Sequence, residues 1–301
     1  FMENIKDYSG RWRWNMVNDF RPQSIEISGI KCYPTANYVN YYGMQNGYPI
    51  NDMTKADAES GYDPTHPWKN RDPRFYKTIM FDGVKWKSTG GAGGTAELFT
   101  GGRESEEANE KKGCFTAYMN SKLCPQLMNT VDGYKENNIM ILSLMRLADV
   151  YLMYAEAAAV GYNGPKGKAA TYSLTAEEAL NKIRERAGVA PVLDKFLGST
   201  ADFLSELRRE RAVELSFEGF RFIDLRRWML LTQYPYTLKT KIEFDRADPS
   251  DYNYDEPEEN AIKNLREVVL LERKYTDRHY WYPLPKKDVS MYEGFYQNPG
   301  W

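Results

Sequence analysis

The longest apolar stretch of the chain runs from Ile139 to Val160, where nearly every face of a helix would be hydrophobic. This pattern is typical of a helix that is buried all round or that spans a membrane, and its length would suffice for a bilayer. The stretch also contains Arg146, Asp149 and Glu156. Because an Arg or Asp at the centre of a bilayer costs about 2.5–3.5 kcal/mol on insertion scales, we expect a helix buried within a folded domain.

A second helix is predicted from the capping box of Thr175 and Glu178, in which each side chain accepts a hydrogen bond from the other residue's backbone. This helix should stop near Gly188, ahead of Pro191, because glycine commonly ends a helix and proline cannot continue one. A third helix is predicted from near Ser199, with Asp202 completing a similar box.

The third helix is expected to end at Gly219, and a fourth, shorter helix should run from about Arg221 to Leu231. Charges inside an apolar helix need partners. We therefore expect the three charged residues of the first helix to form ion pairs where the helices cross, with some of Arg184, Arg209, Arg211, Glu214 and Arg221. The alternative is that most of these charges are solvated, as charge runs on helices usually are.

Upstream of the helices, one short helix is predicted over Ala36 to Tyr42, with Tyr38, Tyr41 and Tyr42 sharing a face by their spacing. The segment from Phe75 to Phe81 favours a strand.

The sequence NRDPRF, which leads into this strand, contains three charged residues that we interpret as structural. They are Arg71, Asp72 and Arg74, and we expect them to pin a loop through salt bridges. The less favoured alternative is a role in ligand binding.

Two further segments are predicted to be loops. The glycine-rich segment from Asp82 to Cys124 has little apolar periodicity, and loops of this length are usually functional or disordered. Trp86 lies between Lys85 and Lys87, so we expect it to face away from the core. The acidic segment from Thr240 to Asn260 could hold calcium, but it lacks the order of an EF-hand, so a solvated loop is favoured.

The composition limits the possible functions. The 301 residues are 42% hydrophobic and 14% aromatic, with a net charge of −2, so the chain can bury a sizeable core and shows no basic face for nucleic acid. With only two histidines, and no motif of a hydrolytic triad or a zinc site, we predict no enzyme and no cofactor. A glycosidase needs only two carboxylates, and such a pair is no signal among 42 acidic residues.

The cysteines are Cys32, Cys114 and Cys124, an odd number without metal-binding spacing. Cys114 and Cys124 could close a short loop in an oxidising compartment. Free thiols are slightly favoured over this disulfide.

Three long motifs resemble the SusD/RagB family of surface nutrient-binding lipoproteins. They are RLADVYLMYAE from Arg146, NKIRERAG from Asn181 and RERAVELSFEGFRFIDLRRW from Arg209, and they occur in the family's order. The YDP and NRDPRF segments between Tyr62 and Phe75 resemble another landmark of the family.

The resemblance implies a mainly α, SusD-like fold with tetratricopeptide-like helix pairs and a loop-rich, partly β region. We divide the chain into a loop-rich segment (1–138), a helical core (139–232) and C-terminal loops with a closing motif (233–301), which together form one continuous domain. Family members are longer and carry a signal and a lipidated cysteine. We therefore expect this sequence to be the C-terminal portion of a precursor, with membrane association only through a lipid anchor outside the chain.

The resemblance also implies non-catalytic capture of an oligosaccharide or polysaccharide at the outer-membrane surface, for delivery to a SusC-like TonB-dependent transporter. The alternative is an interaction scaffold, or a peptide-binding relative, that mainly associates with the transporter. A sugar site needs flat aromatic rings beside hydrogen-bonding side chains. The candidate ligand-binding residues are Trp86, Trp68, Tyr48, Trp12 and Trp14, although core packing is at least as common a role for each one alone.

Overall fold

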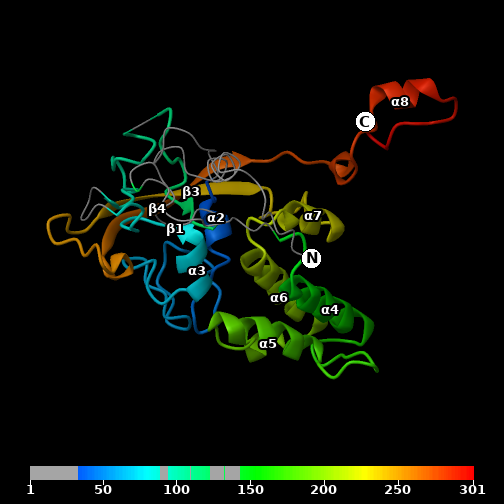
Figure 1. The fold of residues 1–301 in the computed structure, drawn as a ribbon, viewed down its shortest axis with the longest axis horizontal. Coiled ribbons are helices and arrows are strands. Elements are labelled where there is room, and N and C mark those ends of the chain that lie inside the picture. Colours follow the sequence, from blue (N-terminus) through cyan, green and yellow to red (C-terminus); the bar gives the residue numbers. More distant parts are fainter. Residues whose placement is uncertain (1–32, 89–93, 109, 123–131, 133–142) are drawn as a thin grey trace.

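The computed structural model describes residues 33–88, 94–108, 110–122, 132 and 143–301. Its elements are α2 (Ala36–Val39), α3 (Pro73–Thr78), β1 (Ile79–Met80), β2 (Met119–Asn120), α4 (Leu147–Gly161), α5 (Ala176–Ala187), η2 (Asp194–Phe196), α6 (Thr200–Glu214), α7 (Phe220–Arg227), β3 (Leu238–Arg246), η3 (Pro257–Glu259), β4 (Ile262–Glu272), η4 (Asp277–Tyr280) and α8 (Lys286–Met291). In Figure 1, α4, α5 and α6 group on one side, the strands gather with α2 and α3, and the C-terminal segment with α8 projects away.

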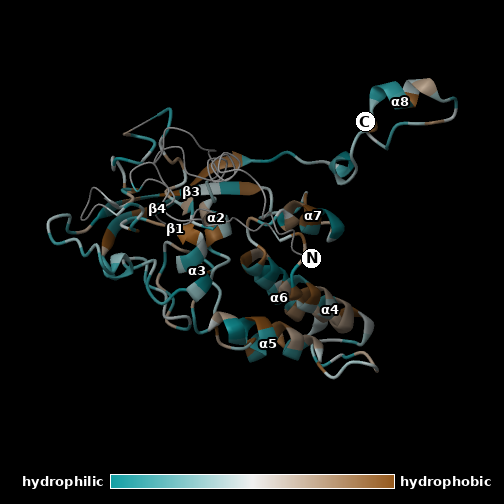
Figure 2. Cartoon of the chain, viewed as in Figure 1, coloured by the Kyte–Doolittle hydropathy of each residue, from teal (hydrophilic) through white to brown (hydrophobic). Residues whose placement is uncertain are grey.

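The predicted helical centre is confirmed as a packed group, which we call the helical region (α4, α5, α6 and α7). Leu152 and Ala155 of α4 pack with Leu180 of α5 and with Phe203 and Leu207 of α6, all fully buried. Figure 2 shows α4 mostly in the colours of apolar residues, whereas α5 and α6 also carry hydrophilic stretches. Among the described residues, no helix combines the length and apolarity that a bilayer crossing requires.

The predicted helix boundaries agree best where a cap specifies them. Thr175 and Glu178 form the predicted capping box, and Gly188 ends α5 in a left-handed conformation with φ of 73°. Ser199 accepts a hydrogen bond from the backbone N–H of Asp202 at the start of α6. The first helix starts later than predicted, at Leu147, and residues 139–142 lie outside the described residues.

The prediction that the third helix extends to Gly219 is wrong. It ends at Glu214, whose backbone carbonyl accepts a hydrogen bond from the guanidinium of Arg146. Phe217 and Gly219 then adopt positive φ values of 59° and 85°, which no α-helix can include. The chain therefore turns before α7 starts at Phe220, which lies close to the predicted fourth helix.

The expected ion pairs form around α6. Arg146 pairs with Glu214 at 2.5 Å, and Asp149 pairs with the buried Arg211 at 2.7 Å, as predicted. Glu156 pairs instead with Arg227 of α7 at 2.6 Å. The fully buried Arg184 of α5 binds the carboxylates of Glu206 and Glu210, and Arg74 of α3 reaches Glu210 and Glu214. Ion pairs therefore join α6 to α3, to α5 and to the start of α4.

A strand over Phe75 to Phe81 is mostly wrong, because the chain forms α3 there instead. The Asp72 side chain accepts the backbone N–H of Arg74, and Pro73 occupies the first helical turn, where its missing N–H costs nothing. Only Ile79–Met80 is extended, paired antiparallel with Met119–Asn120. Arg71 is structural as predicted, but among the described residues it acts through hydrogen bonds and not through a salt bridge: its buried guanidinium donates to the backbone carbonyls of Val39, Pro67 and Tyr42. Asp72 and Arg74 do form a salt bridge, at 2.7 Å.

The predicted acidic loop over Thr240 to Asn260 is wrong for its first part. Residues 238–246 form β3, in which buried Thr240, Ile242, Phe244 and Arg246 alternate with partly exposed charged side chains. The strand pairs antiparallel with β4, from Leu238 opposite Glu272 to Arg246 opposite Ile262. The acidic residues of the loop lie between these strands, and the described residues contain no cluster that could hold a metal ion.

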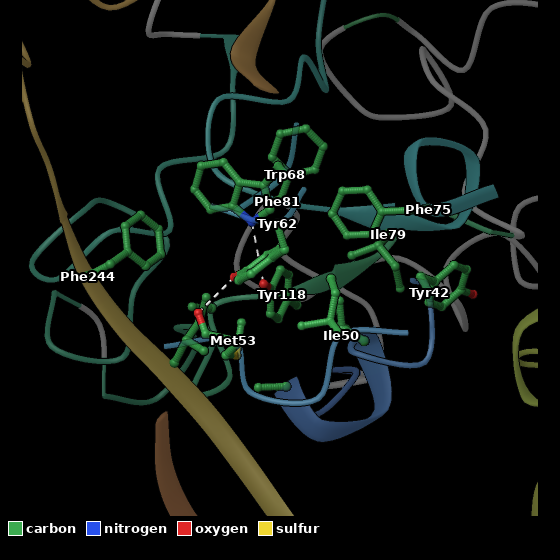
Figure 3. Packing of buried hydrophobic residues seen from close by; sticks show 14 of the residues in the cluster. Tyr42, Ile50, Met53, Tyr62, Trp68, Phe75, Ile79, Phe81, Tyr118 and Phe244 are labelled. Atoms are coloured by element: carbon green, nitrogen blue, oxygen red, sulfur yellow. Dashed lines mark hydrogen bonds between the residues drawn. The ribbon is translucent and has the colours of Figure 1, made fainter. Parts of the chain in front are cut away.

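A second core, which we call the aromatic region, lies between the strands, α2 and α3. Figure 3 shows its packing around Trp68, Phe75, Phe81 and Phe244, and Trp68 Nε1 donates to the hydroxyl of Tyr118 at 3.4 Å. Beside it, the free thiol of Cys114 is buried, which raises its pKa to about 11. Cys32 and Cys124 lie outside the described residues.

Candidate ligand-binding cleft

The two sequence-predicted tryptophans that the structure describes, Trp68 and Trp86, are both buried. Trp68 has no exposed area and belongs to the aromatic region, and Trp86 is only 3% exposed among Met80, Leu98 and Met119. The expectation that Trp86 faces solvent is therefore wrong. It lies in an extended segment, where neighbouring side chains point to opposite faces, so Lys85 is exposed while Trp86 points inward. Trp12 and Trp14 lie outside the described residues.

Tyr48 is partly exposed, with the ammonium of Lys195 lying 4.3 Å above its ring centre. The next residues along the chain, Pro49 to Asn51, form one wall of a large cleft whose described lining does not include Tyr48 itself. Of the predicted candidates that the structure describes, Tyr48 is therefore the one next to the site described below.

The cleft has a volume of about 570 Å³. It is bounded by α2, residues 49–51, α6, the start of α7, the segment before β3, and β4. Its lining residues combine aromatic rings, amides and charged groups: Asn37, Asn40, Tyr41, Pro49, Ile50, Asn51, Phe196, Ser205, Glu206, Arg208, Arg209, Arg221, Tyr234, Pro235, Tyr236, Leu238, Thr240, Glu267 and Val269.

Three tyrosines and Phe196 supply the aromatic surface of the cleft. Tyr234 is 76% exposed, whereas Tyr41 and Tyr236 are partly buried. The guanidinium of Arg221 lies 4.8 Å from the ring centre of Tyr41 and 5.5 Å from that of Tyr236. Stacking on aromatic rings holds a guanidinium in place without using its N–H donors.

The frame around the cleft is fixed by polar contacts between distant segments. The Asn37 side chain donates to the carbonyl of Leu238 at 2.8 Å, and its backbone N–H donates to the Thr240 hydroxyl, which ties α2 to β3. Arg209 Nη1 donates to the carbonyl of Tyr41 at 3.0 Å. Gly43 is required here, because a Cβ would lie 2.2 Å from the backbone oxygen of Tyr48 and 2.9 Å from Arg209 Nη1.

Three buried polar atoms in the lining have no hydrogen-bond partner among the described residues: Asn40 Oδ1, Arg208 Nε and Arg221 Nη1. Arg209 is different, because its guanidinium donates to Glu206 and to the carbonyls of Tyr41 and Gly47. Since buried polar atoms are nearly always satisfied in proteins, the three unpaired atoms mark where the cleft has unused hydrogen-bonding capacity.

The cleft also contains two carboxylates. Burial raises the pKa of Glu206, but Arg209 and Arg184 outweigh it and the net pKa is lowered. Glu206 therefore stays ionised. Glu267 Oε1 accepts a hydrogen bond from the hydroxyl of Thr240 at 2.6 Å.

Sequence reasoning missed this cleft because its walls come from segments about 200 residues apart. Arg209 and Arg221 were both predicted to form ion pairs. Arg209 pairs with Glu206, whereas no carboxylate among the described residues lies at ion-pair distance from Arg221. A usable signal was the QYPYT segment after the helices, in which turn-forming residues present Tyr234 and Tyr236 at the surface.

Comparison with solved structures places this arrangement in a known fold. A SusD-like protein from Bacteroides fragilis superposes with a TM-score of 0.65 at 23% identity, over 89% of this chain and 47% of that protein. A SusD-like carbohydrate binding protein from the same species superposes with a TM-score of 0.54 at 19% identity, over 85% of this chain and 47% of that protein. The chain thus spans about half the length of these structures, and a comparison with curated proteins found no match.

These likenesses confirm the expected mainly α, SusD-like fold. The model of the SusD family matches residues 1–301, the whole of the sequence. The chain is therefore a member of the SusD family.

Proposed function

We propose that this chain binds carbohydrate in the cleft without converting it, and that the whole protein delivers the bound glycan to a SusC-like TonB-dependent transporter at the outer-membrane surface. Membership of the SusD family supports this role, as does the description of one structural neighbour as a carbohydrate binding protein. A lipid anchor would hold the whole protein at the membrane.

The observation that carries the proposal is the chemistry of the cleft lining. Sugars present apolar C–H faces and polar edges, so a site for them combines aromatic rings with amide and guanidinium donors. Tyr41, Tyr234 and Tyr236 supply rings, and Asn40 and the arginines supply unused polar atoms. The volume of about 570 Å³ lies within the range of about 300–1,000 Å³ for small-molecule sites.

The state of Glu206 supports binding without catalysis. A glycosidase needs one carboxylic acid with a raised pKa to protonate the leaving group. The arginines around Glu206 lower its pKa instead and occupy its oxygens. Glu267 is then the remaining carboxylate among the described cleft residues. This lining has no second carboxylate that is free to complete the pair that a glycosidase needs.

Isothermal calorimetry against a panel of neutral and acidic oligosaccharides and short peptides tests the proposal. We expect carbohydrate binding that Tyr236→Ala weakens about fivefold, since an aromatic contact contributes about 1 kcal/mol. Tyr296→Ala, which removes an exposed tyrosine of the C-terminal tail outside the cleft, should bind like the parent protein. Binding of peptides in place of every glycan would overturn the proposal.

A second candidate function is that of an interaction scaffold, and exposed apolar side chains favour it. Leu147 and Val150 of α4 and Phe222 and Ile223 of α7 are all exposed. Copurification with the transporter tests this role. The scaffold role is supported if the chain still copurifies with the transporter while no glycan binds. If Ile223→Glu leaves copurification unchanged, the exposed apolar side chains of α7 are not the contact surface.

A further inference from the structure

We propose that the ligand of the cleft is an acidic carbohydrate, whose carboxylate or sulfate group binds the guanidinium groups of Arg208 and Arg221. This inference rests on the proposed function and specifies its substrate class.

The first observation is that these two arginines lack the carboxylate partners that their neighbours have. Arg209, Arg211 and Arg227 each have a carboxylate oxygen within 2.9 Å. In the described part of the chain, Arg208 and Arg221 have none at ion-pair distance, and one buried nitrogen of each has no hydrogen-bond partner.

Both guanidinium groups are nevertheless held in position by aromatic rings. Arg221 packs over Tyr41 and Tyr236, and Arg208 lies 5.4 Å from the ring centre of Trp228. These contacts fix the planar groups without neutralising them. A planar guanidinium with free N–H donors matches the geometry of a carboxylate or sulfate.

The net charge of the cleft lining also favours an anionic ligand. Its charged lining residues are Glu206, Glu267, Arg208, Arg209 and Arg221. Glu206 and Arg209 pair with each other, and Glu206 also binds Arg184, which does not line the cleft. Glu267 is then the one lining carboxylate left to offset Arg208 and Arg221, so the described lining retains excess positive charge.

The pKa of Lys239, the β3 residue between the lining residues Leu238 and Thr240, is also affected by the positive charge of Arg221. Burial lowers its pKa, and the charges of Arg273 and Arg221 lower it further, to about 8. Lys239, which is not itself in the lining, therefore adds a positive group close to Arg221. A partly buried, unpaired positive charge is costly, and an anionic ligand removes that cost whereas a neutral sugar hydroxyl does not.

Calorimetry with matched pairs of probes tests the inference. One pair is a short oligogalacturonide and its carboxyl-reduced, neutral counterpart, and the other is chondroitin and chondroitin sulfate oligosaccharides. We expect an acidic probe to bind and its reduced form to bind at least about tenfold more weakly, a factor that corresponds to about 1.4 kcal/mol. Both members of the chondroitin pair carry a carboxylate, so this pair shows whether an added sulfate group increases the affinity.

Arg208→Gln and Arg221→Gln should each lower the affinity for the acidic probe about tenfold, and the affinity for its reduced, neutral form by a smaller factor, because only the acidic probe loses a contact between opposite charges. Arg186→Gln makes the same change at an exposed arginine of α5 outside the cleft and should change neither affinity. Circular dichroism melting verifies that each variant folds. If a variant does not fold, the salt dependence of ligand binding by the parent protein tests the inference instead. Added sodium chloride should weaken the binding of acidic ligands and not that of neutral ones.

The outcomes separate this inference from the proposed function. If acidic probes and their reduced forms bind equally, or if both arginine variants keep full affinity for the acidic probe, the acidic ligand class is wrong and carbohydrate binding stands. If neither acidic nor neutral carbohydrate binds, the proposed function itself fails.

Discussion

The helical region and the aromatic region of this protein are stabilised in different ways. In the helical region, charged side chains of α6 are buried with their partners, as with Arg184 between Glu206 and Glu210. In the aromatic region, Trp68, Phe75 and Phe81 pack ring against ring, and backbone carbonyls satisfy the buried Arg71.

This difference affects both folding and binding. The ion pairs of the helical region depend on pH, because a carboxylate must stay ionised to keep its partner. The aromatic region depends on close packing, which pH does not change between neutral and acidic conditions. The cleft lies where the two regions meet, so variants of either region can alter it, and only the direct lining residues should alter binding without altering stability.

Trp68→Ala is expected to have the largest effect on stability. It removes a fully buried ring that packs on Phe81 and Phe244, and such truncations cost about 3–5 kcal/mol. Chemical denaturation should show this loss equally at pH 7 and pH 5. A loss that changes strongly between these pH values would show that the two regions do not differ as described.

Arg184→Met should cost about 3 kcal/mol, at the low end for breaking a buried pair, because Glu206 keeps Arg209 and Glu210 keeps Arg74. The matched control is Arg186→Met on the same helix, where the side chain is 56% exposed and a loss below about 1 kcal/mol is expected. Equal losses in the two variants, measured by denaturation, would contradict the importance of burial here.

Acidification should destabilise the helical region through Glu210. Burial raises the pKa of Glu210, but Arg74 and Arg184 lower it to about 2 from its ordinary value of 4.5. Because the folded pKa is the lower one, this stabilisation is complete above pH 4.5 and is lost as the pH falls towards 2. The loss is on the order of 2–3 kcal/mol.

Denaturation curves at pH 6 and pH 3 measure this effect when the parent protein is compared with Glu210→Gln, which should lose less stability between the two pH values. Glu185→Gln, at a carboxylate that is 75% exposed on α5, should keep the pH dependence of the parent. A pH dependence that is identical in all three proteins would refute the contribution of Glu210.

The smallest expected effect is that of Thr175→Ala. It removes the acceptor of the Glu178 backbone N–H at the start of α5, and the loss of an N-cap costs about 1 kcal/mol. Thr171→Ala, a few residues earlier in an exposed turn, is the matched control and should be close to neutral. Thermal melting of both variants is sufficient to compare them.

The helices could be predicted from the sequence because their signals are local. Thr175, Glu178 and Gly188 lie within one segment, and each specifies a boundary through contacts with near neighbours. Strand β3 was missed because Lys241, Glu243 and Asp245 make the segment read as a charged loop, although its buried residues alternate with them. The partner that makes this alternation a strand, β4, lies farther along the chain and is also rich in charge.

The candidate site could not be predicted for a related reason. Trp86 was selected because its neighbours are lysines, whereas burial depended on residues such as Met119 that pack over it from another segment. The cleft brings together Asn40, Arg208 and Tyr236, whose proximity is visible only after folding. The cleft contains aromatic rings, amides and guanidiniums, the kinds of residue expected of a sugar site, but at positions other than the predicted ones.

The buried thiol of Cys114 can be used to measure local opening of the structure around it. Its Sγ donates to the carbonyl of Tyr118, and the residue is only 3% exposed, so a reagent in bulk solvent has little access to the thiol. A thiol-specific dye can therefore label this position only during excursions that separate Met119 and Trp86 from it. The labelling rate therefore measures how often this part of the structure opens. Cys114 does not line the cleft, so a ligand there should slow labelling only if its binding also stabilises the segments around the thiol.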